Sequence, residues 1–113
     1  ALDDFFKNED LEVDFVKIDV QGAEPMALRG MTDLVTRSRN LKMITEFYPE
    51  GLRIAGSSAE EYLRNLMECG FEIYYLNQRK RKLEPVNMRK DARIYAGTLF
   101  CSKAHKQFCS PFT

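Results

Sequence analysis

Three acidic side chains stand at the ends of hydrophobic stretches and are the best candidates for chemistry. Asp19 lies near the end of Phe15–Val20, Glu24 opens the helix that follows, and Glu46 lies near the end of Leu41–Phe47. A carboxylate beside a reacting hydroxyl can orient that hydroxyl or accept its proton. We predict that the three carboxylates converge on one rim and act there as catalytic residues.

Each of these residues also has a structural interpretation. Asp19 would cap a helix or anchor a loop, and Glu24 would sit at a helix N-terminus, where negative charge is stabilised. Glu46 taken alone is a weak signal. Tyr48 would line the same rim or pack as an ordinary aromatic after a strand. The sequence leaves these alternatives open.

Lys17 is the unusual residue of the first hydrophobic stretch. The near-continuous apolar run Phe15–Val20 is typical of a strand covered on both faces. A buried lysine is costly unless it is paired. Side chains two apart on a strand share a face, so we expect an ion pair between Lys17 and Asp19, either structural or part of the site.

Other candidates for chemistry are weaker. His105 is the single histidine and lies in the C-terminal tail. A basic run after the third hydrophobic stretch predicts a solvated hairpin or a surface for an acidic or phosphorylated partner. That run comprises Arg79, Lys80, Arg81 and Lys82, with Arg89, Lys90 and Arg93 further on. No Ser-His-Asp set, zinc motif or phosphate-binding glycine loop is present.

Composition favours an ordinary globular protein. The 113 residues include 17 basic and 17 acidic ones, so there is no basic excess of the kind that nucleic-acid binders show. The apolar runs are too short to span a bilayer and no signal peptide is visible. Three cysteines, Cys69, Cys101 and Cys109, match no metal or redox spacing. We therefore expect a cytoplasmic protein with reduced cysteines and no nucleic-acid or membrane partner.

Four strands are predicted to position the acidic residues. They span Phe15–Val20, Leu41–Phe47, Phe71–Leu76 and Ile94–Ser102. The stretch 48–51, with its proline and glycine, is typical of a turn, and 78–92 of a long basic connection.

Helices are predicted between these strands. A short turn covers Leu2–Phe6, and a second helix starts at Glu24 and is broken at Gly30. Ser58 and Glu61 form a capping box for a third, amphipathic helix that ends at Gly70. The alternation predicts an α/β fold with a parallel sheet, and the last two strands, which have no helix between them, predict an antiparallel final strand.

One segment resembles a known family. The run from Val13 to Glu24, with Lys17-Ile18-Asp19-Val20 and Gly22-Ala23-Glu24, followed by Leu28-Arg29-Gly30, is similar to the central signature of FkbM-type methyltransferases. Leu2-Asp3-Asp4 resembles the lead-in of that family, and Ile44-Thr45-Glu46-Phe47 its next strand. The resemblance extends from Leu2 to about Leu76.

The resemblance implies a Rossmann-like class I methyltransferase, whose seven strands have the order 3-2-1-4-5-7-6. Residues 1–103 would be the C-terminal portion of that domain, a partial doubly wound sheet of strands 4 to 7, and 104–113 a short tail. The cofactor would be S-adenosyl-L-methionine, with Asp19, Val20 and Gln21 near it. Its main binding elements, a glycine-rich turn and a second acid, are absent from this chain.

The family typically methylates hydroxyl oxygens of small molecules such as sugars, so the implied partner is a small hydroxyl acceptor. The start at Ala1 looks like a cut through a longer protein, although tag removal would also produce it, and we expect this segment alone to be inactive. The alternative is a non-catalytic module that binds a partner. A sheet that begins at Phe15–Val20 also has an open edge, which predicts self-association there or coverage by Leu2–Phe6.

Overall fold

The computed structural model describes residues 1–7, 12–86 and 97–103 of the chain. Its helices are α1 (Leu2–Phe5), α2 (Glu24–Arg29), α3 (Thr32–Arg37), α4 (Pro49–Ile54) and α5 (Ala59–Glu68). Its strands are β1 (Phe15–Ile18), β2 (Lys42–Phe47), β3 (Phe71–Asn77), β4 (Lys82–Pro85) and β5 (Gly97–Lys103). No helix among these residues is long and apolar enough to cross a membrane.

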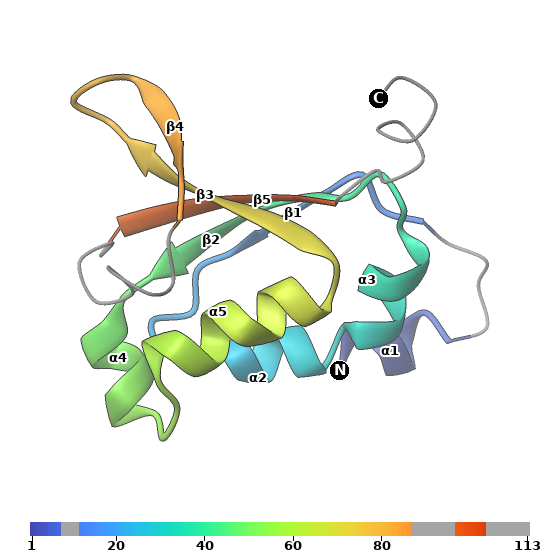
Figure 1. Cartoon of the computed structure of the whole chain (residues 1–113). Helices are drawn as coiled ribbons and strands as arrows, with labels where there is room; N and C mark the ends of the chain where they lie inside the picture. The colour runs from blue at the N-terminus through green and yellow to red at the C-terminus, as the bar shows by residue number, and fades with distance from the viewer. Residues whose placement is uncertain (8–11, 87–96, 104–113) are drawn as a thin grey trace.

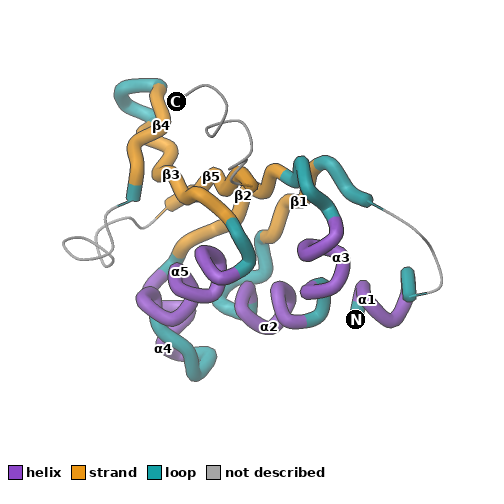
Figure 2. Tube along the Cα trace, turned by 45° about the vertical axis from the view of Figure 1, so that its right-hand side comes forward, coloured by secondary structure: helices purple, strands orange, loops and turns teal. Residues whose placement is uncertain are grey.

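The strands form one mixed sheet in the order β1-β2-β5-β3-β4 (Figures 1 and 2). β1 and β2 are parallel, with Ile18 beside Thr45. β5 lies between β2 and β3 and is antiparallel to both. The predicted antiparallel final strand is therefore confirmed, and β1, β2 and β3 all run in the same direction.

All the helices lie on one face of this sheet (Figure 1). Side chains alternate accordingly: Met43, Thr45 and Phe47 of β2 are buried beneath the helices, whereas Ile44 and Glu46 on the other face are only partly covered. The prediction that the first strand is covered on both faces is wrong. Lys17 is exposed, so its charge stays in water, and within the described residues no ion pair joins it to Asp19.

Two elements were missed by the sequence patterns. The predicted turn at 48–51 is the start of α4, which tolerates Pro49 because the first helical position needs no N–H partner. Part of the predicted basic connection is β4, which among the described residues is an edge strand paired with β3 alone. Its charged residues resemble those of a loop, because edge strands often carry charges that discourage further pairing.

The core lies between the helices and the covered face of the sheet. Tyr62 of α5 is fully buried there, and its hydroxyl lies 2.7 Å from the Thr45 hydroxyl of β2. Burial raises the pKa of the Tyr62 phenol above its usual value. Burial also raises the pKa of the Cys101 thiol to about 12, in keeping with a thiol that packs rather than reacts.

Helix ends follow the predicted signals in most respects. The Ser58 hydroxyl accepts the Glu61 N–H at 3.1 Å, as predicted, but the Glu61 carboxylate accepts from the Ser57 hydroxyl instead of completing the reciprocal bond. Gly70 follows α5 with a φ of +95°. Gly30 separates α2 from α3, as expected.

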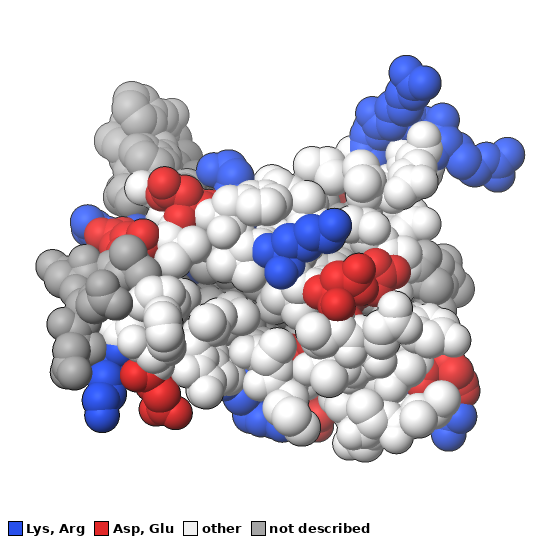
Figure 3. Space-filling model, turned by 180° about the vertical axis from the view of Figure 1, so that it is seen from behind, with Lys and Arg blue, Asp and Glu red and all other residues white. Residues whose placement is uncertain are grey.

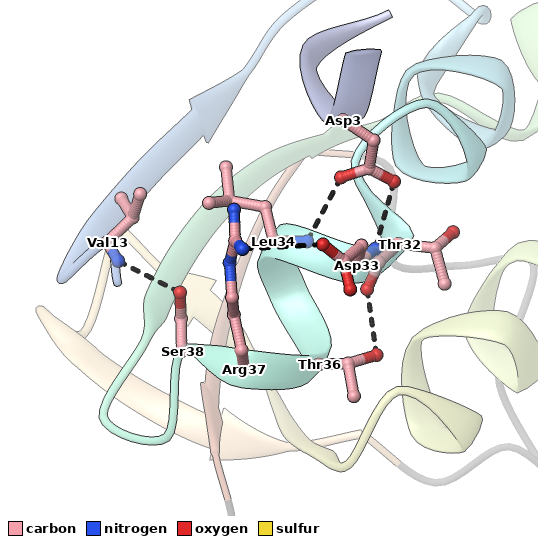
Figure 4. A network of polar contacts seen from close by, with 8 residues as sticks. All are labelled: Asp3, Val13, Thr32, Asp33, Leu34, Thr36, Arg37 and Ser38. Carbon is pink, nitrogen blue, oxygen red and sulfur yellow. Dashed lines mark hydrogen bonds and ion pairs between the residues drawn. The ribbon is translucent and has the colours of Figure 1, made fainter. Parts of the chain in front are cut away.

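A long-range cap secures α3 (Figure 4). The N-cap residue of α3 is Met31, and its side chain makes no capping hydrogen bond. Instead the two carboxylate oxygens of Asp3 accept the N–H groups of Asp33 and Leu34 at 2.9 and 3.0 Å. The Asp3 N–H in turn donates to the Gly30 carbonyl at 2.9 Å. The start of the chain is thereby fixed to the helix layer.

Replacing Asp3 with alanine should lower the free energy of unfolding by about 0.5–2 kcal/mol, because two helix N–H groups lose their acceptor. Asp4→Ala is the matched control, since the Asp4 side chain is exposed and, among the described residues, caps no helix and lies 3.9 Å from the Ala1 amino group. Urea denaturation of both variants checks the expectation. Equal losses in the two variants would contradict the capping role.

The outer edge of β1 is unpaired among the described residues, because α1 joins the helix layer and β1 bonds only to β2. The Lys42 N–H donates to the Asp14 carbonyl, and backbone groups alternate along a strand, so the Lys17 N–H points away from β2.

This edge predicts self-association that Lys17→Pro weakens and Lys17→Ala does not, because only proline removes the outward donor. Sedimentation velocity over a range of concentrations measures it. A wild-type chain that stays monomeric throughout would refute the edge as a pairing site.

Candidate active site

Asp19 and Glu46 lie at the carboxyl ends of two adjacent parallel strands, β1 and β2. Ile18 pairs with Thr45, so the two acidic residues follow at equivalent positions of adjacent strands. Asp19 is exposed and Glu46 is half-buried, and by strand alternation both lie on the face that the helices leave open. Ligands of open α/β sheets bind at this end of the strands. We call this edge the acidic rim.

Glu24 approaches the same loop from the opposite side. Its side chain is 1% exposed. One carboxyl oxygen accepts the Gly22 N–H at 2.8 Å and the other the Val20 N–H at 3.1 Å. Both oxygens are thus engaged by the loop that follows β1, and the geometry gives Glu24 a positioning role behind the rim.

The loop itself is a tight turn closed by a bond from the Ala23 N–H to the Val20 carbonyl. Its two central residues, Gln21 and Gly22, have φ values of +56° and +103°. Positive φ at both positions is typical of a type I′ turn. The side chains of Gln21 and Asp19 are both exposed.

Gly22 is needed for space as well as for its conformation. A Cβ atom at this position would lie 2.6 Å from the carbonyl oxygen of Gly51 in α4. A Cβ at Gly51 would in turn lie 2.6 Å from the ring of Tyr48. The loop, α4 and the end of β2 therefore pack by direct approach of backbone to backbone and ring.

The remaining predicted residues are spread around the rim. Val20 is 45% exposed and Tyr48, just after β2, is 50% exposed. Exposed Lys17 is on the same face as Asp19 by alternation. His105, Cys109 and the basic residues Arg89, Lys90 and Arg93 lie outside the described residues.

Two surface hollows are candidate ligand sites. One of about 620 Å³ lies on the helix layer between α2, α3 and α5 and is lined by none of the predicted site residues. A smaller one of about 320 Å³ is lined by the end of β3 and the start of β5, including Asn77, Arg79 and Thr98. We favour the smaller hollow, because its lining residue Thr98 is the cross-strand neighbour of Glu46 and because it lies at the ligand-binding end of the strands.

Thr98 is a rim residue that sequence reasoning missed. It pairs with Glu46 across β2 and β5. The sequence places these residues 52 positions apart, and only the insertion of β5 beside β2 makes them neighbours. Within the described residues, no group of three His, Cys, Asp or Glu side chains is arranged to hold a metal ion.

Gly22→Ala should destabilise the protein more than Gly56→Ala. Both glycines have positive φ, which costs an alanine about 1–2 kcal/mol. Only Gly22 faces backbone, whereas a Cβ at Gly56 would meet open space. The clash should add about 1–3 kcal/mol to the loss, as overpacking does. Thermal and urea unfolding of both variants measure the difference, and equal losses would remove the steric argument.

The comparisons with known proteins agree with the signature around Asp19. A family model described as the methyltransferase FkbM domain matches residues 1–73. That span contains all three predicted carboxylates. Neither the curated proteins nor the solved structures yielded a match. Because the family model covers more than half of the chain, this protein belongs to the FkbM methyltransferase domain family.

Proposed function

We propose that this chain forms the acceptor side of an S-adenosyl-L-methionine-dependent methyltransferase that methylates a hydroxyl oxygen of a small molecule or sugar. The observation that carries the proposal is that Asp19 and Glu46 each directly follow the paired residues Ile18 and Thr45, at the carboxyl ends of two adjacent strands inside the matched family domain.

The sheet order supports the finer fold assignment. In the class I methyltransferase order, the last four strands read 4-5-7-6. The observed sequence of neighbours β1-β2-β5-β3 follows that arrangement, with β5 reversed between two strands of common direction. β4 then adds a short edge strand beyond this set. We therefore assign β1, β2, β3 and β5 to strands 4, 5, 6 and 7 of a Rossmann-like methyltransferase.

The residues of the rim are chemically suited to a sulfonium cofactor. Adenosylmethionine carries a positive sulfonium and an amino group, and Asp19 and Glu46 offer two carboxyl groups at one edge. Asp19, Val20 and Gln21 would contact it from the turn after β1. When bound, it supplies the electrophilic methyl group. The chain shows no glycine-rich turn for the rest of the cofactor, so we propose that the 113-residue segment alone is inactive.

Asp19 would act on the acceptor. Its exposed carboxyl group is within the rim and can accept a hydrogen bond from the acceptor hydroxyl, which orients the oxygen or takes its proton as the new bond forms. Glu46 would hold the acceptor from the neighbouring strand. Glu24 keeps the Asp19 turn in place through the Val20 and Gly22 N–H groups, and holding groups in line accounts for much of the acceleration.

Replacing Asp19 with alanine in the full-length protein should lower kcat by about 100-fold or more while the fold stays intact. Asp19→Asn separates the two roles, because an amide can still accept a hydrogen bond but cannot take the proton. Asp14→Ala, an exposed acid at the opposite end of β1, is the matched control. Methyl transfer from labelled adenosylmethionine measures activity, and circular dichroism monitors the fold.

Full activity in Asp19→Ala would remove this residue from the mechanism. A full-length wild-type protein that neither binds adenosylmethionine nor transfers its methyl group would favour the alternative, a module that binds a partner without catalysis.

A further inference from the structure

We propose that the methyl acceptor carries a phosphate group and that the β3–β4 hairpin recognises it. The inference rests on the proposed function for the location of the acceptor hydroxyl. It names a binding site at the hairpin, outside the predicted catalytic residues, and a chemical class of ligand: a small hydroxyl-bearing molecule with a phosphate, such as a sugar phosphate or a nucleoside-diphosphate sugar.

The hairpin tip concentrates positive charge. Arg79, Lys80, Arg81 and Lys82 are consecutive and all exposed. Figure 3 shows the protruding tip, at the upper right, covered by Lys and Arg, whereas charges of both signs are mixed over the rest of that side. Four adjacent cations repel one another in water, so an anion placed among them is stabilised.

The tip is held in shape by neutral and acidic partners that leave most of its cations available. The Asn77 amide donates to Glu84 at 3.1 Å, and its oxygen accepts the Lys80 N–H at 3.1 Å. Lys80 lies 3.9 Å from Glu84. In the part of the chain that the structure describes, Arg79, Arg81 and Lys82 make no ion pair.

A hollow lies between this tip and the start of β5. The cavity of about 320 Å³ is lined by Asn77, Gln78 and Arg79 of the hairpin and by Gly97 and Thr98 of β5. Its volume is within the range that small-molecule sites occupy. Thr98 pairs with Glu46, which lies beside Asp19. A molecule in the hollow would thus contact Arg79 on the hairpin side and, on the other side, Thr98, the cross-strand neighbour of Glu46.

The charge arrangement fits a phosphorylated acceptor better than a neutral one. The acidic rim suits a hydroxyl and a sulfonium group and disfavours an anion. Arg79 and Arg81 carry planar guanidinium groups that bind phosphate through two parallel hydrogen bonds. The phosphate would therefore lie at the hairpin and the acceptor hydroxyl at the rim, which fixes the orientation of the molecule across the hollow.

Binding to the wild-type 113-residue chain tests this without requiring catalysis. Glucose 6-phosphate, uridine-diphosphate glucose, glucose and inorganic phosphate are titrated separately, with amide resonances of the hairpin and of Thr98 followed by NMR. We expect the two phosphorylated sugars to shift both regions, their relative affinities to distinguish monophosphate from diphosphate recognition, and glucose to shift neither. Shifts by inorganic phosphate as strong as those by the sugar phosphates, confined to the tip, would overturn the proposal, as would no shifts at all.

Two triple variants that each remove three positive charges distinguish a specific effect of the hairpin on binding from an effect of the net charge of the protein. The triple variant Arg79→Gln, Arg81→Gln, Lys82→Gln should weaken binding about tenfold or more, since each lost contact to phosphate is charge-assisted. The triple Arg29→Gln, Arg39→Gln, Arg64→Gln removes the same charge from exposed positions elsewhere and should bind normally. Equal weakening in both would contradict the assignment. Because these are binding measurements, the outcome is independent of whether Asp19→Ala abolishes methyl transfer.

Discussion

The rim depends on the hydrogen bonds that the buried carboxyl of Glu24 accepts from the loop after β1. A buried carboxyl group is costly unless its oxygens are satisfied, and here two backbone N–H groups satisfy them. The Val20 and Gly22 N–H groups lie beyond the end of β1 and, among the described residues, make no strand hydrogen bonds, so the Glu24 carboxyl also satisfies them. One side chain therefore ends the strand, shapes the turn and begins α2. The orientation of Asp19 relative to Glu46 follows from that fixed turn.

Packing around the turn holds the ends of β1 and β2 in place against the helices. Gly22 brings the backbone of the turn against Gly51, which ties α4 to β1. Tyr62 joins α5 to β2 through Thr45, one residue before Glu46. Asp3 attaches the first residues of the chain to α3. These contacts lie on the helix-covered side of the sheet, so they stabilise the rim from behind.

Negative and positive side chains lie at different places along this end of the sheet. Carboxyl groups gather where β1 and β2 end, and cations gather where β3 turns into β4. The reversed strand β5 lies between them and contributes Thr98. Under the proposed function, this polarity would separate the reacting hydroxyl and the sulfonium group from the anionic part of an acceptor. This separation of charge is not visible in the net charge, which is zero because acidic and basic residues are equal in number over the whole chain.

Local features of the protein can be predicted from short stretches of its sequence. Periodicity, caps and turn residues specified α2, α5, β2 and β3, because each depends on neighbours a few positions away. The run from Lys17 to Glu24 likewise identified the family, which the domain match confirms. Patterns failed where a charged edge strand or a proline-led helix resembles a loop, as in β4 and α4.

Contacts between residues that are distant in the sequence follow from the way the elements pack in three dimensions. That Asp3 caps α3, that Gly22 needs the backbone of Gly51 and that Thr98 lies beside Glu46 depend on contacts between segments far apart in the chain. The sequence also placed Lys17 in a strand covered on both faces, whereas the helices lie on one face only. Burial is set by how elements pack together, and the order of residues within one element does not encode that packing.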